Sequence, residues 1–278
     1  MHFYRTVISG VDMFIPACSP FIGFVDSSNT QEKTLIASQT VRSNMSCNND
    51  WLTAIDVSQY QGNIIWKKVK DAGIDFAYIR SNAGLNEDDL LRQNCNRAKK
   101  NSIPFGLYVY IKPENDVVAQ MRMVLDNHKK YGATLIPQID IEHDGGVKPK
   151  VLKQIVRTCI KMATDELGKP PAIYTYAVFW NAHVSMRLGV SHCPLWVARY
   201  VYYSDAEFKA NPIPRDPSLW RDYAFNSKKI PPAVKGWKTW DAWQFAGNYD
   251  HAGKKFGMTS AHLDLNIVKR ASYDKFVL

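Results

Sequence analysis

Two carboxylates at the end of an apolar stretch are the residues of this sequence best suited to chemistry. Asp140 and Glu142 close the segment 135–142, which reads LIPQIDIE. Side chains alternate faces along a strand, so the two acids share one face, with Cα atoms about 6–7 Å apart. Burial and mutual repulsion raise the pKa of such acids, which suits general acid catalysis near neutral pH. Asp-x-Glu alone is a weak motif, and a pair of solvated acids at the start of a loop is the alternative.

Strand and helix patterns alternate along the chain from Trp51 onward, and these elements must position the acids. We expect strands at 53–57, 75–80, 103–111, 134–142, 172–176, 195–200, 240–245 and 263–268, and helices at 64–72, 88–100, 115–131, 148–167 and 178–187. Strands that alternate with helices pair in parallel, and eight of them in about 220 residues fit a (β/α)8 barrel. The fold class predicted is therefore α/β, an irregular TIM-like barrel. It is irregular because 202–238 has five prolines and no clear period, and because the last two strands lack full helices.

The first 50 residues differ in composition from the rest. An apolar start is followed by a run rich in Ser, Asn and Thr between Asp26 and Asp50. We predict a poorly structured N-terminal extension at 1–50 and a catalytic barrel at 51–278. The apolar run 7–25 contains Asp12, Pro16 and Pro20, so it is a poor signal or anchor, and stable membrane insertion is not expected.

Four acids fall at or near the ends of predicted strands. They are Asp56 on the first strand, Asp140 and Glu142 on the fourth, and Asp264 on the eighth. The active sites of such barrels lie at the C-terminal ends of the strands, and the first and eighth strands are neighbours, so Asp56 and Asp264 should lie close together. Each buried, unpaired carboxylate lowers the stability of the folded protein by several kcal/mol. Four of them at one mouth therefore indicate a function or a bound cation. Oxygen ligands alone suit Mg²⁺ or Ca²⁺, but no His stands with these acids at ligand spacing, so no metal is expected.

Aromatic and amide side chains fall at similar points along the chain. Flat apolar faces combined with a few hydrogen-bonding groups are typical of a sugar-binding lining. The candidates are Tyr60, Tyr108, Tyr110, Tyr174, Tyr176, Trp196, Trp243 and Gln244.

The formal net charge of +9 favours an anionic partner such as nucleic acid, a membrane surface or a cell wall. The lysines are scattered and no Arg-rich run with interleaved aromatics occurs, so nucleic acid is not expected. Five cysteines without a Cys-x-x-Cys indicate neither a disulfide framework nor a zinc site, and no cofactor is expected.

Several motifs in order resemble one known family. The segment 56–66 reads DVSQYQGNIIW, and it is followed by VKDAGIDFAYIR at 69–80, DIE at 140–142, LWVARY at 195–200, WQF at 243–245 and LDLN at 263–266. Over about residues 51–270 the chain is similar to the glycoside hydrolase family 25 lysozymes. The resemblance implies hydrolysis of the β-1,4 bond between N-acetylmuramic acid and N-acetylglucosamine in peptidoglycan. It adds Arg80 and Arg199, which lie within these motifs, to the expected substrate contacts.

The sequence departs from the family pattern at two places. The third strand usually carries Tyr-His-aromatic, whereas this chain has Tyr108-Val109-Tyr110, which puts one substrate contact in doubt. The stretch 202–238 is also longer than expected, so the rim of the cleft is expected to differ. No cell-wall-binding repeats follow the barrel, so attachment to the wall would fall to the barrel, its charge or the N-terminal extension.

The resemblance and the strand positions together imply roles for the acids. We expect Glu142 to be the general acid, with its pKa raised by Asp140 and by burial, and the configuration to be retained. Asp140 or Asp264 would act as nucleophile or orient the substrate's N-acetyl group, and Asp56 would bind sugar hydroxyls or hold the acid network. The protein would be a monomer acting outside the cytoplasm, as a secreted or phage-encoded lysin. A chitinase-like glycosidase and a non-catalytic glycan-binding barrel are the alternatives.

Overall fold

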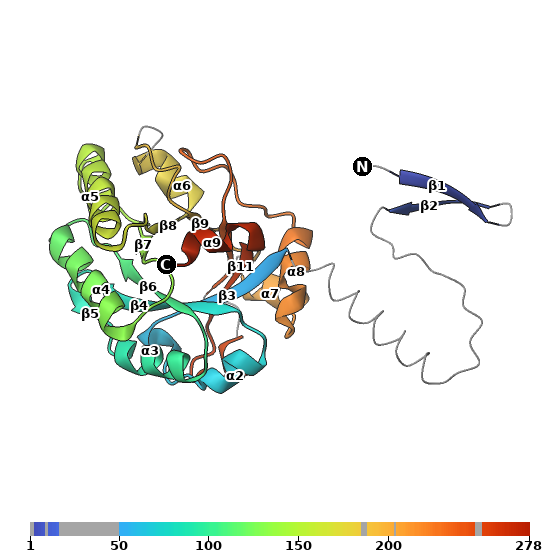
Figure 1. Ribbon diagram of the computed structural model, residues 1–278, viewed down its shortest axis with the longest axis horizontal. Coiled ribbons are helices and arrows are strands. Elements are labelled where there is room, and N and C mark those ends of the chain that lie inside the picture. Colours follow the sequence, from blue (N-terminus) through green and yellow to red (C-terminus); the bar gives the residue numbers. More distant parts are fainter. Residues whose placement is uncertain (1–2, 9–10, 17–49, 185–187, 203, 248–251) are drawn as a thin grey trace. The chain divides into compact units, whose positions relative to one another are not determined.

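The computed structural model describes residues 3–8, 11–16, 50–184, 188–202, 204–247 and 252–278 (Figure 1). Contacts divide the chain into two units, Met1–Cys47 and Asn48–Leu278. In the first unit, β1 (Phe3–Ile8) and β2 (Val11–Pro16) pair as an antiparallel hairpin, which the sequence analysis did not predict. The expectations for 17–49 fall outside the described residues.

Eight of the strands described in the second unit close into a ring, which confirms the predicted barrel. The order around the ring is β3-β11-β10-β9-β8-β7-β6-β4, and pairing of β3 with β4 completes it. The two-residue strand β5 (Asn86–Glu87) extends the sheet beside β4. The eight strands are β3 (Trp51–Val57), β4 (Phe76–Ala83), β6 (Phe105–Tyr110), β7 (Gln138–Asp140), β8 (Ala172–Thr175), β9 (Leu195–Ala198), β10 (Ala242–Ala246) and β11 (Asp264–Lys269).

The last strand corrects the prediction of a wholly parallel barrel. β11 runs antiparallel to both of its neighbours, β10 and β3. The connection from β10 to β11 contains the short turn η4 (Gly253–Phe256). A parallel pairing needs a crossover that carries the chain back along the barrel, usually a helix, whereas an antiparallel strand can start at the edge where the previous strand ended. The start of β11 therefore lies at the same edge of the barrel as the C-terminal ends of the other seven strands.

Helices surround the ring of strands (Figure 1). They are α2 (Trp66–Asp71), α3 (Leu91–Lys100), α4 (Val117–Tyr131), α5 (Pro149–Leu167), α6 (Ala177–Phe179), α7 (Asp205–Ala210), α8 (Trp220–Asn226) and α9 (Tyr273–Phe276), with the short turns η1 (Gln59–Gln61), η2 (Trp180–Val184), η3 (Pro217–Leu219) and η5 (Arg270–Ser272). Within the described ranges, none of the helices is long and apolar enough to cross a membrane.

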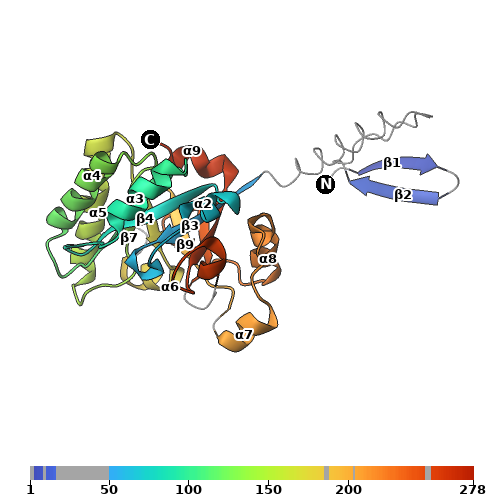
Figure 2. The ribbon, with the colours of Figure 1, turned by 90° about the horizontal axis from the view of Figure 1, so that it is seen from below.

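Helix ends follow the sequence signals closely. α4 and α5 end at the predicted positions 131 and 167, where Gly132 and Gly168 adopt the left-handed conformation. The N-cap of α4 is Asp116, one residue after the predicted start at 115, and its carboxylate accepts a hydrogen bond from the backbone N–H of Ala119 at 3.1 Å. The aperiodic stretch 202–238 contains α7 and α8, which lie on the side of the barrel away from α4 and α5 (Figures 1 and 2).

The inward-facing side chains change from apolar to polar toward the edge of the barrel where β11 begins. Leu52 and Ala54 precede Asp56 on the inner face of β3, and Phe76 and Tyr78 precede Arg80 on that of β4. The apolar end of the barrel is filled by a cluster that includes Trp196 and, from α9, Phe276, whose rings lie 5.7 Å apart. Most other buried apolar side chains pack between the barrel and its helices. The sequence thus closes one end of the barrel with a core and leaves polar groups at the other.

One glycine is required by the packing inside the barrel. A Cβ atom on Gly106 of β6 would lie 2.4 Å from a ring carbon of Tyr78. The Tyr78 ring occupies this space, and its hydroxyl donates to the backbone carbonyl of Ile136 at 3.0 Å. Glycine therefore stands at 106 because the interior holds a large aromatic side chain beside it.

Candidate active site

A cavity of about 460 Å³ opens at the polar end of the barrel. All four acids predicted from the strand ends line it. Of the other expected contacts, it is lined by Tyr60, Arg80, Tyr108, Tyr110, Tyr174 and Gln244. The mouth predicted from the strand ends is therefore a real concavity that combines carboxylates, phenols and amides.

Asp56 is held by two amide side chains from neighbouring strands. Asn266 Nδ2 donates to its carboxylate at 2.8 Å, and Gln244 Nε2 donates to both carboxylate oxygens at 3.1 and 3.2 Å. The Trp196 indole N–H donates to Asn266 Oδ1 at 2.8 Å. Since an indole N–H can only donate, it fixes which end of the Asn266 amide faces Asp56. The Tyr174 hydroxyl donates to Gln244 Oε1 at 2.8 Å, on the other side of the Gln244 amide from Asp56.

Asp264 lies directly opposite Asp56 in the pairing of β11 with β3, and the two carboxyl groups are hydrogen-bonded to each other. The predicted proximity of these two acids is correct, but Asp264 stands at the start of an antiparallel strand rather than at the end of a parallel one. Burial raises the pKa of Asp56 from its usual value, and its hydrogen bonds from Asn266, Gln244 and Asp264 oppose the rise.

Asp140 is the most buried of the four acids, with 7% of its surface exposed. Its Oδ1 atom has no hydrogen-bond partner in the structure. Burial raises the pKa of Asp140 well above its usual value, the charges of Glu142, Asp56 and Asp264 raise it further, and Arg80 opposes them. Asp140 is therefore a carboxyl group that favours its protonated form.

Glu142 follows β7 and lies half-buried at the cavity wall. Burial raises the pKa of Glu142, and the charge of Asp56 adds to this rise. The sequence analysis expected Asp140 to supply that charge. Instead, the charge of Glu142 raises the pKa of Asp140. This follows from their environments, because the more deeply buried acid is the one that keeps its proton.

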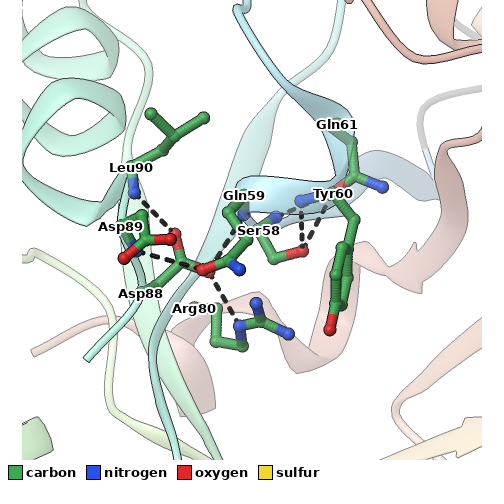
Figure 3. Close-up of polar contacts among 8 residues, drawn as sticks. All are labelled: Ser58, Gln59, Tyr60, Gln61, Arg80, Asp88, Asp89 and Leu90. Carbon is green, nitrogen blue, oxygen red and sulfur yellow. Dashed lines mark hydrogen bonds and ion pairs between the residues drawn. The ribbon is translucent and has the colours of Figure 1, made fainter. Parts of the chain in front are cut away.

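Arg80 is fixed on one side of the cavity by a buried acid that the sequence analysis did not select. Its Nε atom donates to Asp88 at 2.8 Å, and its guanidinium lies 4.7 Å from the ring centre of Tyr60 (Figure 3). Asp88 also accepts from the backbone N–H groups of Gln59 and Leu90, at 2.9 and 3.0 Å. One carboxylate thus joins the turn that carries Tyr60, the end of β4 and the start of α3.

The turn around Tyr60 is also fixed from within. The Ser58 hydroxyl accepts from the backbone N–H of Tyr60 at 3.2 Å, and Gln61 Oε1 accepts from the backbone N–H of Ser58 at 2.8 Å (Figure 3). This is a capping box, here on a 3₁₀ turn. Tyr60 is 71% exposed, so the turn presents an aromatic face to a ligand without burying it.

Two of the expected aromatic contacts lie away from the cavity. Trp243 is fully buried on the outer face of β10, and its indole N–H donates to the Arg199 carbonyl at 2.7 Å. Alternation along the strand explains this, since Gln244 faces inward and its neighbour must face outward. Trp196 faces inward but lies below the cavity, where it positions Asn266.

A second cavity of about 300 Å³ adjoins the first at Glu142, Tyr174 and Tyr200. Tyr176 and Arg199 line it, so these two expected contacts lie on the far side of Glu142 from Arg80 and Tyr60. The concave surface therefore extends to both sides of Glu142.

Metal binding has no geometric support in the part of the chain that the structure describes. There, no group of three or more His, Cys, Asp or Glu side chains is arranged to hold a metal ion. The acids are spread around the ring of strands, and Asp56 is bonded to the amides of Gln244 and Asn266 and to Asp264.

The comparisons with known proteins give the family. A family model described as "Glycosyl hydrolases family 25" matches residues 55–254, which is most of the barrel. The chain belongs to glycosyl hydrolase family 25. Each of the family 25 motifs seen in the sequence contributes at least one residue to the lining of this cavity.

Individual relatives agree with this family. Lysozyme M1 of Streptomyces globisporus is 26% identical over 224 residues, covering 76% of this chain and 66% of that protein. YegX of Escherichia coli is 31% identical over 152 residues, covering 52% of this chain, and the chain spans about half (55%) of its length. The crystal structure of a bacterial lysozyme from Streptomyces coelicolor matches the fold with a TM-score of 0.59, at 24% identity over 77% of this chain and 90% of that one.

Several residues at this family 25 site were not selected from the sequence. Alternation from Tyr108 and Tyr110 would have found Lys112, and alternation back from Asp140 would have found Gln138; both line the cavity. Tyr200 lies two residues beyond Ala198, which ends β9 on its inward face, and it also lines the cavity. Asn266 is two residues from Asp264 on the same face. Asp88 had no such signal, because it reaches the site through Arg80.

Proposed function

We propose that this chain is a peptidoglycan hydrolase, an N-acetylmuramidase that cleaves the β-1,4 bond between N-acetylmuramic acid and N-acetylglucosamine. The observation that carries the proposal is the pair Asp140 and Glu142, two carboxyl groups of raised pKa beside a sugar-sized cavity. Membership of family 25 and the likeness to Lysozyme M1 support it. The protein would work outside the cytoplasm, on the bacterial wall.

In this proposal Glu142 is the general acid that protonates the leaving glycosidic oxygen. It lies between the two adjoining cavities, so a glycan that occupies both would present a bond beside it. Its raised pKa would keep a proton available near neutral pH. Asp56 already accepts hydrogen bonds from two amides, which suits an anchoring role better than proton transfer.

Asp140 would be the partner of Glu142 on the reacting sugar. Its Oδ1 atom has no partner of its own, so it is available to a substrate group. It would act either as the nucleophile or by orienting the substrate's N-acetyl group, and both routes retain the configuration of the sugar. The anomeric form of the first product, read by NMR, tests retention directly.

The decisive experiment is Glu142→Gln on purified peptidoglycan. Loss of a general acid should lower kcat by about 10²- to 10⁴-fold while the protein remains folded. Glu166→Gln, a change at an exposed acid of α5, is the matched control and should retain activity. Near-normal lysis by Glu142→Gln would contradict the assignment. Identification of the new reducing end separates the activities, since a muramidase exposes muramic acid and a chitinase-like enzyme exposes glucosamine.

A further inference from the structure

We propose that Lys112 is a specificity-determining residue that binds a carboxylate carried by the muramic acid side of the glycan. The inference rests on the proposed muramidase function and deepens it. It starts from a basic side chain that lines the acid-rich cavity and for which the structure gives no ionic partner.

The backbone directs Lys112 toward the cavity. It lies two residues beyond Tyr110, so it continues the inward-facing row formed by Tyr108 and Tyr110 on β6. The side chain of Gln120, which is fully buried on α4, fixes its peptide groups: Lys112 N–H donates to Gln120 Oε1 at 2.9 Å, and Gln120 Nε2 donates to the Lys112 carbonyl at 2.8 Å. A buried amide used in this way holds one loop residue in one orientation.

The aliphatic stem of Lys112 lies against a glycine. A Cβ atom on Gly84 would come within 2.8 Å of Lys112 Cδ, so the chain beside β4 leaves a channel for this side chain. Asn82 Nδ2 donates to the Gly84 carbonyl at 2.7 Å and to the Gln120 carbonyl at 3.3 Å. Asn82 therefore connects Gly84, which borders the channel, with Gln120, which binds the Lys112 backbone. Lys112 is therefore a supported side chain and not a lysine that extends freely from the surface.

The nearby acids do not neutralise this ammonium group. β6 pairs with β7 so that Tyr110 lies opposite Asp140, which puts Lys112 and Glu142 beyond the ends of neighbouring strands. For the described residues, the structure records neither a hydrogen bond nor an ion pair of Lys112 Nζ. Burial raises the pKa of Asp140 and of Glu142, which reduces the negative charge that they place beside Lys112. Arg80 differs, since it is already paired with Asp88.

A half-buried cation that forms no ion pair with a described residue, at the wall of a substrate cavity, is suited to an anion on the substrate. Muramic acid differs from glucosamine by its 3-O-lactyl group. That group carries a carboxylate when it is free and leads to the carboxylates of the stem peptide when it is acylated. Lys112 would therefore favour the muramic acid residue over the otherwise identical N-acetylglucosamine.

Equilibrium binding tests this without requiring turnover. The ligands are the muramic acid–glucosamine disaccharide with a free lactyl carboxylate, its primary amide, and the same disaccharide carrying a dipeptide with free carboxylates. The proteins are the wild type, Lys112→Gln, Lys112→Arg, and Lys150→Gln, which removes the same charge at an exposed position of α5. Calorimetry at low salt gives each affinity, and whichever acidic ligand shows the preference identifies the source of the carboxylate.

We expect the wild type and Lys150→Gln to bind one of the acidic ligands about five- to tenfold more tightly than the amide. Lys112→Gln should lose that preference while its affinity for the amide stays unchanged, and Lys112→Arg should restore most of it. A wild type that binds acid and amide equally, a preference that survives Lys112→Gln, or no measurable binding of any ligand would overturn the proposal. Lysis of cell walls by wild-type protein is scored separately. Failure there counts against the muramidase function, whereas carboxylate selectivity depends only on the binding measurements.

Discussion

At the scale of single residues, the site consists of acids whose environments differ. Asp56 accepts three hydrogen bonds from two amides, Asp140 is buried with an oxygen that has no partner, and Glu142 is half-exposed at the wall. Burial raises the pKa of all three carboxyl groups, and that of Asp140 lies well above its usual value. The pH dependence of activity and of stability should therefore respond differently to each substitution.

Asp56→Asn should move the alkaline limb of the activity profile to lower pH. The negative charge of Asp56 raises the pKa of Glu142, so its removal lets Glu142 lose its proton at a lower pH. The measurement is kcat/KM on a soluble glycan between pH 4 and pH 9. Asp126→Asn, at an exposed acid of α4, is the control and should leave both limbs in place. An alkaline limb that does not move in Asp56→Asn would argue against Glu142 as the acid.

Asp140→Asn should stabilise the protein at neutral pH while reducing activity. The folded-state pKa of Asp140 lies above that of the unfolded chain, so its contribution favours folding below about pH 3.9 and is lost as the pH rises through the folded-state value. Asparagine does not ionise, so the Tm difference between variant and wild type should be near zero at pH 3 and reach several degrees at pH 7. The same scans on Asp126→Asn should show no such trend, and a Tm gap in Asp140→Asn that shrinks with rising pH would contradict the reasoning.

At the scale of elements, the alternation of side chains along each strand determines which residues face the site. Where alternation is applied to the chain, it is correct: it puts Asp140 and Glu142 on one face, and it would have put Trp243 outside the barrel. Depth along the barrel axis is not encoded in a single strand, because it depends on the stagger between neighbours, so Trp196 could not be assigned to the core from its sequence.

Other differences have similarly local causes. The direction of β11 depends on the length and path of one connection, and the helices α7 and α8 lack the periodicity that would identify them. Eight strands and most helices were nevertheless placed within a few residues. The reason is that apolar runs and terminal glycines mark them directly.

Gly106→Ala tests the packing within the barrel elements. The new methyl group would overlap the Tyr78 ring, so unfolding in denaturant should show a loss of about 1–3 kcal/mol. In a Tyr78→Leu background the ring is absent and the same substitution should cost less, which a double-mutant cycle measures. An equal cost in both backgrounds would mean that the penalty arises elsewhere in β6.

At the scale of the whole molecule, a basic protein surrounds an acidic cavity. The net charge of +9 would draw the protein to an anionic wall, while the four acids lie in a concave site at one end of the barrel. Attachment and cleavage should then respond differently to salt, because exposed charges are screened and buried ones are not.

Binding of the inactive variant Glu142→Gln to walls should weaken about tenfold or more between 50 mM and 500 mM salt. At the higher salt concentration, attraction between exposed charges is screened beyond a few ångströms. Co-sedimentation with purified walls measures this, and neutral chitin serves as the matched control, which should show little salt dependence. Wall binding that is indifferent to salt would indicate recognition through the glycan alone.

The antiparallel β11 also has a consequence for biosynthesis. Asp56 and its hydrogen-bond donor Asn266 stand 210 positions apart, and β3 has an open edge until β11 pairs with it. At about 5–20 residues per second, a ribosome needs roughly 10–40 s to make the intervening chain. Late in that interval the nascent chain carries Asp56, Asp140 and Glu142 but neither Asp264 nor the strand that closes the ring. The candidate site is therefore completed only after β11 has been made, so a ribosome that stalls before β11 yields a product without a finished site.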